Sequence, residues 1–477
     1  MWDFTLNNYS GAWSLVVQIL LLLVFLLLGN VLRRAIPFLR KAYIPSALLG
    51  GLLLLVCNIL LKNVFHVNIP GFGYEGIIDQ NVMQTITYHS LAIGFIAMTL
   101  KINKREDKKD GTGVRSIQNG LLTGATYMLQ AVFGIFAILI FVWAGKTYFY
   151  DTGVLLPLSF GQGPGNALTW DMNFSNPEYM AELGVTENYL TSGGSLGLSL
   201  ASIGFIVASI VGVIYINIHR RTGSLVKETV IEKRKLNEFI DKNEIQDSES
   251  VDKLSVQVAF VGLAYALTFG IMSLLSLNKF TNMIAWGFNF IFGVISAIIV
   301  KTILNLLTKK NVVHRRYINN YQMDRISGFS FDIMIIAGVA AIEINDIQNY
   351  IVPIIVLSIV GTIVTYLYVR IITRLCFKGY EHEMFLVNFG TLTGTASNGM
   401  ILLREVDPSF ETPASNIFTI SQFPAMIAVA PLLLLLKFSA TSIVKTYIAL
   451  GIFFALFIAY TVLIIVFARR SKSKKVN

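Results

Sequence analysis

The sequence has few charged residues, cysteines and histidines. Of 477 residues, 14% are charged, five are histidine and two are cysteine. Cys57 and Cys376 both lie in apolar stretches, so neither a disulfide framework nor a cysteine-bound metal cluster is expected. The histidines form no His-Glu-x-x-His motif, and no glycine-rich stretch continues into the Gly-Lys-Ser/Thr of a phosphate loop. We therefore expect no enzyme activity and no bound cofactor.

What the sequence has instead is a series of long apolar runs. Apolar and aromatic residues make up 54% of the chain, and the mean hydropathy is +0.64. These values are typical of an all-α polytopic membrane protein. Crossing a bilayer as a helix takes about 20 apolar residues. Eleven runs are that long, near residues 13–32, 42–62, 82–101, 117–144, 190–218, 254–276, 282–307, 327–344, 349–376, 413–437 and 441–468.

The charges between these runs predict an orientation. Basic connections, such as the one with Arg33 and Arg34, alternate with acidic ones, such as the one with Asp151 and Asp171. Since cytoplasmic loops carry an excess of lysine and arginine, the N-terminus is predicted outside and the C-terminus inside a cell membrane. The net charge of +10 lies in these short connections, so it indicates contact with anionic lipid and not with nucleic acid.

Two glycine-containing stretches interrupt the pattern of plain spans. Residues 160–167 and 389–396 both read Phe-Gly-x-x-x-Gly-x-Ala, and they follow the fourth and ninth spans. Three glycines and Pro164 in the first stretch cannot continue a regular helix. Non-helical backbone at membrane depth is tolerated only where protein buries it or water reaches it. Paired breaks of this kind are the sequence signature of a transporter binding site.

The positions of the two breaks predict inverted repeats. Five spans per half is an odd number, so the second half is upside down relative to the first. Re-entrant loops near 155–171 and 384–404 would then enter the membrane from opposite faces. We expect a first repeat over 1–219, a cytoplasmic linker over 220–253, a second repeat over 254–437, and an extra span with a basic tail over 438–477.

The polar residues of the two stretches are the candidate site. Hydroxyl and amide oxygens suit a weakly bound hard cation such as sodium, and free N–H groups at a half-helix start suit a carboxylate. The candidate substrate-binding residues are Ser159, Gln162, Gly163, Gly165, Asn166, Thr393, Gly394, Thr395, Ser397 and Asn398. The candidate sodium ligands are Asn166, Thr169, Thr391 and Thr395. The alternative is that these glycines are only helix-packing contacts.

Other polar and small residues in the spans have less specific readings. Small residues at four-residue steps, at 193, 197 and 201 and at 204, 208 and 212, indicate close helix packing and not a Gly-x-Ser-x-Gly nucleophile turn. Asp332 is either functional or solvated near a span end, and His89 favours a structural hydrogen bond. Arg404 is expected to pair with Glu405 or Asp407, although it could instead attract an anionic substrate.

Several of these residues resemble the bacterial sodium/glutamate symporter family. Lys41-Ala42-Tyr43-Ile44-Pro45, leading to Gly50-Gly51, is similar to a signature of that family, and Gln130 lies in a similar glutamine-containing stretch. The two glycine stretches fall where the family carries its paired re-entrant loops. The resemblance implies a divergent member: a sodium-driven transporter, a homodimer, in which a loop-bearing transport domain moves against a scaffold domain.

The sequence and the resemblance together predict sodium-coupled import of glutamate or a related small carboxylate or amino acid by alternating access. The predicted partners are this small anion, Na⁺, the lipid bilayer and a second copy of the chain. The alternative is an ion channel or passive pore that uses the paired loops as a filter. Currents through single molecules would favour the pore, and slow, saturable, sodium-dependent uptake would favour the carrier.

Overall fold

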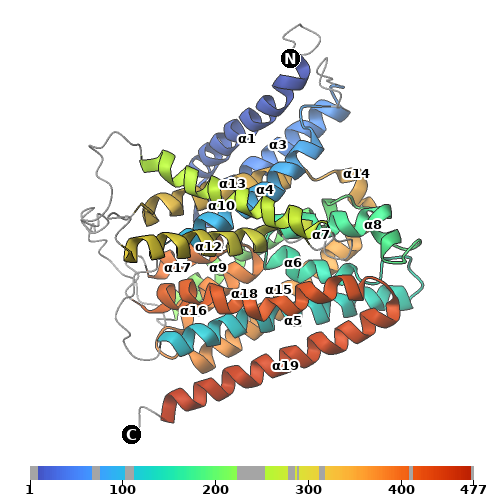
Figure 1. Cartoon of the computed structure of the whole chain (residues 1–477). Coiled ribbons are helices and arrows are strands. Elements are labelled where there is room, and N and C mark those ends of the chain that lie inside the picture. Colours follow the sequence, from blue (N-terminus) through green and yellow to red (C-terminus); the bar gives the residue numbers. More distant parts are fainter. Residues whose placement is uncertain are drawn as a thin grey trace. The chain divides into compact units, whose positions relative to one another are not determined.

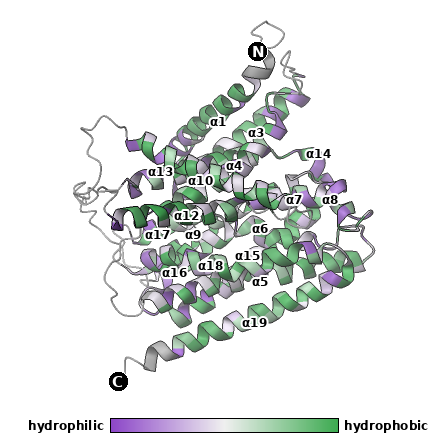
Figure 2. Ribbon diagram, in the orientation of Figure 1, coloured by the Kyte–Doolittle hydropathy of each residue, from purple (hydrophilic) through white to green (hydrophobic). Residues whose placement is uncertain are grey.

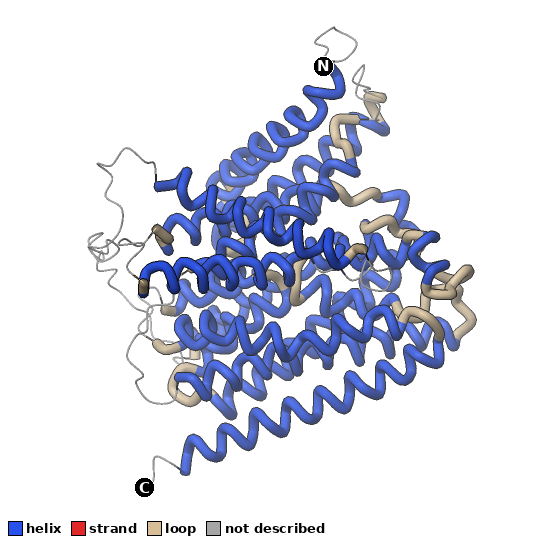
Figure 3. The backbone as a smooth tube through the Cα atoms, in the orientation of Figure 1, coloured by secondary structure: helices blue, strands red, loops and turns tan. Residues whose placement is uncertain are grey.

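The structure is a computed structural model that describes residues 9–66, 76–101, 112–222, 253–277, 285–286, 289–310, 317–407 and 412–473. Helices joined by loops and turns make up this described part, which contains no strand (Figure 3). Nine of its helices are long and apolar enough to cross a membrane. The protein is therefore a polytopic helical membrane protein, as the composition predicts.

The nine candidate spans agree with nine of the predicted runs. They lie in α1 (Tyr9–Ala35), α3 (Ser46–Asn63), α5 (Thr112–Trp143), α9 (Ser195–Arg221), α10 (Lys253–Leu275), α12 (Asn289–Lys309), α15 (Ile351–Cys376) with the short helices before it, α18 (Ala414–Ser439) and α19 (Ile443–Ser473). The other two predicted runs also form helices, α4 (Gln80–Leu100) and α13 (Asn320–Ala340), of 21 residues each. Figure 2 shows that α1 and α19 are apolar along most of their length.

Shorter helices connect these long ones. They are α2 (Pro37–Lys41), the 3-10 helix η1 (Thr152–Val154), α6 (Leu155–Phe160), α7 (Pro164–Ser175), α8 (Pro177–Glu182), α14 (Ile344–Ile347), the 3-10 helix η3 (Gln348–Tyr350), α16 (Glu381–Thr393) and α17 (Ala396–Val406). Proline begins several of them: Pro37, Pro164 and Pro177 all lie in a first turn, where the missing N–H has no helical partner to lose.

The chain folds into two compact units that do not follow the order of the sequence. One unit comprises Met1–Met83, Asp107–Ile231 and Gly338–Asn477, and the other comprises Gln84–Glu106 and Glu232–Ala337. The predicted repeats describe a different property, the internal symmetry of the chain, and remain a prediction. Most of the predicted linker over 220–253 lies outside the described residues.

The larger unit has α5 at its centre. This helix packs against α15, α18 and α19, and Figure 1 shows α19 running beside it. Two glycines permit a close approach between α5 and α18. A Cβ added at Gly120 would lie 2.7 Å from the Ala425 nitrogen, and one added at Gly124 would lie 2.5 Å from Ala428 Cβ. Asn119 Nδ2 also donates to Ser421 Oγ across this contact, at 2.8 Å.

The smaller unit consists of α10, α12 and most of α4 and α13. Its core is built from buried apolar residues of these helices, including Ile96, Ala264 and Ala297. His89 of α4 forms a hydrogen bond with Tyr265 Oη of α10, as predicted, and its structural role remains a prediction. Asp332 is exposed on α13, and no described side chain pairs with it.

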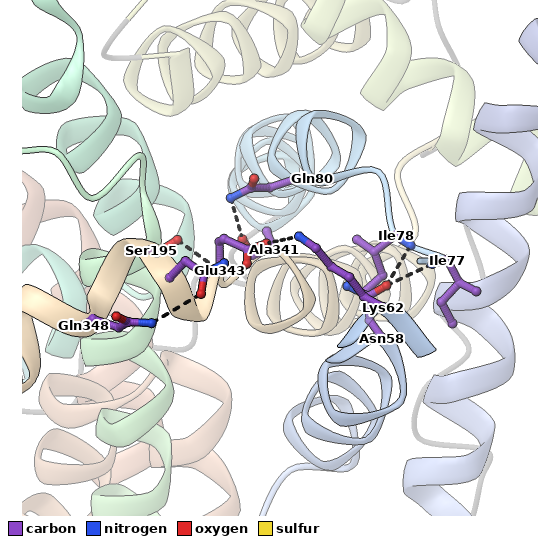
Figure 4. Close-up of polar contacts among 10 residues, drawn as sticks. Asn58, Lys62, Ile77, Ile78, Gln80, Ser195, Ala341, Glu343 and Gln348 are labelled. Atoms are coloured by element: carbon purple, nitrogen blue, oxygen red, sulfur yellow. Dashed lines mark hydrogen bonds and ion pairs between the residues drawn. The ribbon is translucent and has the colours of Figure 1, made fainter. Parts of the chain in front are cut away.

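A polar network fastens the segment before α15 to its neighbours in the larger unit (Figure 4). Gln80 Nε2 donates to the Ala341 carbonyl at 3.2 Å, and Lys62 Nζ lies 3.6 Å from Glu343 Oε2. The backbone N–H of Glu343 donates to Ser195 Oγ at 3.0 Å. Ser195 is the first residue of α9, so these contacts tie the start of that helix to the chain leading into α15.

Candidate functional site

The first glycine stretch forms the turn of a helical hairpin. Helix α6 ends at Phe160, and α7 begins at Pro164. Gly163 between them has a φ of +78°, which is strained for a residue with a side chain. Gly161 has no room for a Cβ, since one added there would lie 1.9 Å from the ring of Tyr127. Gly163 is therefore required by the turn, and Gly161 by its contact with Tyr127 of α5.

The second stretch forms a similar hairpin from α16 and α17. Here Gly394 and Thr395 leave the helical conformation, with φ values of −141° and −140°. The two helices cross closely just behind the turn. A Cβ added at Gly390 would lie 2.8 Å from Gly399 Cα, and one added at Gly399 would lie 2.2 Å from the Val387 carbonyl oxygen. As in the first hairpin, one helix ends at the turn and another begins there.

Helix α9 shows that the two hairpins approach from opposite directions. Near its start, the backbone N–H of Gly197 donates to Asp171 Oδ2 of α7 at 2.8 Å. Near its end, Arg220 Nη1 contacts Glu405 Oε1 of α17 at 2.9 Å. Between these ends, a Cβ added at Gly204 would lie 2.3 Å from the Thr393 carbonyl oxygen and 3.2 Å from Phe160 Cδ1. The two hairpin turns therefore meet α9 at the same level.

One face of α5 contacts both turns. Tyr127 Oη donates to the Gly161 carbonyl at 2.6 Å. One helical turn further on, Gln130 Nε2 donates to the Leu392 carbonyl at 3.0 Å and to Thr365 Oγ1 of α15 at 2.7 Å. Residues three apart on a helix share a face, so α5 positions the two turns together. Helices α5, α9 and α15 thus surround the place where the hairpins meet.

Several buried polar atoms around these turns have no hydrogen-bond partner among the described residues. A buried polar atom without a partner costs about 1–3 kcal/mol, so a group of them calls for an explanation such as a ligand, an ion or water. The atoms are Ser159 Oγ, Gln162 Nε2 and Asn166 Oδ1 at the first turn, Thr395 Oγ1 and Asn398 Nδ2 at the second, and Gln130 Oε1 on α5.

The turns also present helix ends that carry partial charge. The N-cap residues of α7 and α17, Gly163 and Thr395, form no side-chain cap hydrogen bond, although these helices are 12 and 11 residues long. The carbonyl ends of α6 and α16 lie at the same two turns. Free N–H groups attract an anion, and free carbonyls attract a cation. The arrangement can therefore hold ions of both signs without a charged side chain.

The predicted site residues fall into two groups. In the first group, a side-chain polar atom has no partner. These residues are Ser159, Gln162, Asn166, Thr395 and Asn398. In contrast, three of the predicted hydroxyls donate to the carbonyl four residues earlier in their own helix: Thr169 to Gly165, Thr391 to Val387 and Thr393 to Phe389. Their oxygens keep a lone pair for a cation. The side chain of Ser397 lies outside the described residues.

Two acidic residues of the predicted outer connection, Asp151 and Asp171, have fully buried side chains. Asp171 lies within α7 and accepts hydrogen bonds from Ser192 Oγ at 2.5 Å, Ser175 Oγ at 3.1 Å and the Gly197 N–H. Asp151 precedes η1 and accepts from Ser439 Oγ at 2.7 Å. Both anchor the base of the first hairpin.

Burial also decides the charge state of Asp151. Loss of solvation raises the pKa of its carboxyl to about 8, and the hydrogen bond from Ser439 lowers it only in part. The neutral acid is thus the favoured form near neutral pH. Sequence reasoning missed this role because the partner hydroxyl lies 288 residues away along the chain.

The small residues of α9 act as packing positions, as their spacing predicts. Gly197 faces the Ala167 carbonyl of α7, and Gly212 faces Leu402 of α17. Glu405 forms its ion pair with Arg220, from the end of α9, a pairing that the sequence did not suggest. The glycines of α9 therefore let both hairpins approach this helix closely.

Comparison of the sequence with models of known protein families and with curated proteins finds no match in either case.

Proposed function

We propose that the protein is a sodium-coupled symporter that imports glutamate or a related small carboxylate or amino acid across the cell membrane. The observation that carries the proposal is the meeting of two broken helical hairpins, from opposite ends of α9, at buried polar atoms that lack partners. Inverted-repeat transporters bind substrate at interrupted helices of this kind. The resemblance of the motifs to the bacterial sodium/glutamate symporter family supports the same function.

The chemistry of the turns fits an anion bound next to a cation. Uncapped N–H groups at the starts of α7 and α17 would receive a substrate carboxylate. Asn166 Oδ1, Thr395 Oγ1 and the carbonyls at the ends of α6 and α16 would receive Na⁺, a hard cation that prefers oxygen ligands. Because opposite charges bound close together attract, sodium would strengthen substrate binding.

The proposal includes the finer architecture. The hairpins would be re-entrant loops of two inverted repeats, α4 and α13 would complete eleven spans, and the N-terminus would lie outside. The two compact units would correspond to a transport part and a scaffold part, with a second copy of the chain as partner. A sodium gradient would drive uptake, since each charge moved inward across 100 mV supplies about 2.3 kcal/mol.

The test is uptake of labelled glutamate by proteoliposomes that contain the purified protein. We expect saturable uptake under an inward sodium gradient and none when potassium replaces sodium outside. Asn398→Ala removes an unpartnered amide at the second turn and should abolish uptake. Asn345→Ala, which changes an exposed asparagine of α14, is the matched control and should leave uptake intact. Uptake that is independent of sodium would refute the coupling, and single-molecule currents would favour a pore.

A further inference from the structure

A second group of polar and cationic side chains lies at the other end of α16 from the hairpin turn. Its members are Arg370 of α15, Tyr215 and His219 of α9, and His382 at the start of α16. Helix α16 has 13 residues, which at a rise of about 1.5 Å per residue separates this group from the turn by almost 20 Å. The group is therefore separate from the proposed transport site.

Hydrogen bonds orient these side chains. His219 Nδ1 lies 3.0 Å from the Tyr215 carbonyl, which can only accept, so this nitrogen carries the proton. His219 Nε2 is then free to accept from Arg370 Nη2, at 3.3 Å. Tyr215 Oη completes the chain with a contact of 2.8 Å to His382 Nδ1. A continuous chain of hydrogen bonds thus connects the guanidinium, the two imidazoles and the phenol.

Arg370 is held in place but is not neutralised. Its guanidinium lies over the Tyr215 ring, 5.1 Å from the centroid, and over the Phe385 ring at 5.9 Å. Nη1 is buried and has no hydrogen-bond partner in the part of the chain that the structure describes. Among the described residues no carboxylate forms an ion pair with Arg370, although Glu381 lies near enough to feel its charge. A fixed cation with one unused edge is the arrangement that receives an oxyanion.

The charges around His382 also favour an anion at this position. Burial, together with the positive charges of Arg370 and Arg374, lowers the pKa of His382 to about 4, although Glu381 opposes the shift. The two arginines of α15 therefore make the local potential positive despite the acid on α16. An arriving anion would reverse this potential and favour the protonated imidazole.

We propose that Arg370 and His382, with His219 holding the guanidinium in place, bind an oxyanion, which is either free phosphate or the phosphate group of an anionic lipid. Arg370 Nη1 donates to one oxygen, and His382 donates to another after taking up a proton. All three side chains are half-buried, so small rotations open the site to the ligand. Since Tyr215 stacks on Phe385 with centroids 4.2 Å apart, and Phe385 on Phe389 at 5.4 Å, the bound anion also steadies α16.

The test uses the purified full chain in detergent, without sodium or glutamate, and radiolabelled sulfate as the probe. Sulfate keeps its charge between about pH 5 and pH 8, so any pH dependence reports the protein. We expect saturable binding that tightens as the pH falls. Arg370→Gln should weaken it at least about tenfold, the value of one charge-assisted hydrogen bond. Arg374→Gln, an exposed arginine one turn further along α15, should change it less than about twofold.

Two further variants separate binding from folding. Arg370→Lys keeps the charge but loses the planar fork, so it should fold as the parent does and bind sulfate several-fold more weakly. His382→Gln should bind sulfate but lose the pH dependence, because the residue that takes up the proton is gone. Binding by Arg370→Gln or Arg370→Lys that equals that of the unmodified chain would overturn the proposal, and so would the absence of saturable binding.

The source of the anion is decided in nanodiscs. Sulfate binding in phosphatidylcholine that is lost on addition of phosphatidylglycerol assigns the site to a lipid headgroup, provided that Arg370→Gln removes the lipid effect. Equal binding in both membranes assigns it to a free oxyanion. None of these measurements involves glutamate or sodium, so they test the anion site independently of the proposed transport function.

Discussion

The most direct test of the converging hairpins is a single methyl group at Gly204. In Gly204→Ala the new Cβ would lie 2.3 Å from the Thr393 carbonyl oxygen and 3.2 Å from Phe160 Cδ1. Nonbonded heavy atoms settle at about 3.5 Å or more, so the second hairpin must retreat by roughly 1 Å. A backbone carbonyl at the end of α16 cannot rotate away as a side chain would.

The expected cost follows from this overlap. Overpacking a close-packed interior typically costs about 1–3 kcal/mol, so the variant should unfold at a lower temperature than the parent. Sodium-dependent uptake should be lost even at temperatures where the variant is still folded, because the displaced carbonyl lies at the proposed site. The matched control is Gly451→Ala in α19, where an added Cβ meets no atom within 4 Å. Alanine there should be neutral or favourable by up to about 1 kcal/mol.

Both variants are compared by thermal unfolding in detergent and by uptake into proteoliposomes. If Gly204→Ala matched Gly451→Ala in melting temperature and in sodium-dependent uptake, the two turns would not meet at α9 as described. A lower melting temperature with full uptake would support the described packing but contradict a transport site at this position.

Three other predictions concern the surroundings of the turns. Gln130→Leu leaves the Leu392 carbonyl without its donor, so we expect a loss of about 1–3 kcal/mol, measured as a lower melting temperature. Asn398→Ala removes an amide whose Nδ2 has no partner, so the ligand-free protein should keep its melting temperature while its stabilisation by sodium plus glutamate disappears. Asp151→Asn tests the buried carboxyl: its pKa of about 8 exceeds the unfolded value near 4, so native Asp151 loses stability as the pH rises between these values. As the pH rises across this range, the melting temperature of Asp151→Asn should therefore increase relative to that of the parent. A difference that does not change with pH would refute the raised pKa of Asp151.

Features that depend on local composition could be predicted from the sequence. Span-length apolar runs become helices because a chain in lipid must satisfy its own backbone. The break at residues 160–167 could be predicted because three glycines and Pro164 cannot continue a regular helix, and the break at 389–396 because it repeats the same Phe-Gly-x-x-x-Gly-x-Ala pattern. The polar atoms left over at these turns follow from the same stretches, as Asn166 and Asn398 illustrate.

Features that depend on distant partners could not be predicted. Nothing in the sequence around Tyr127 distinguishes it from other aromatic residues of an apolar helix, and its role follows only from the Gly161 carbonyl that it contacts. Aspartate is common in loops, so the sequence does not indicate that Asp171 is buried. Its carboxylate accepts a hydrogen bond from the Gly197 N–H, near the start of α9. The division into two compact units, each assembled from separated segments, likewise arises from packing and has no signal in the order of the runs.

The position of α5 has a consequence for how the protein is made. This helix contacts both turns, yet its partners at the second turn are synthesised 235 to 262 residues later, as the contacts of Gln130 with Thr365 and Leu392 illustrate. A nascent chain would therefore leave the amide and hydroxyl groups of its first hairpin uncovered on this side until α15 and the second hairpin are made. Ribosome-bound intermediates should consequently need shelter from an insertase or chaperone, and premature stops before α15 should be degraded.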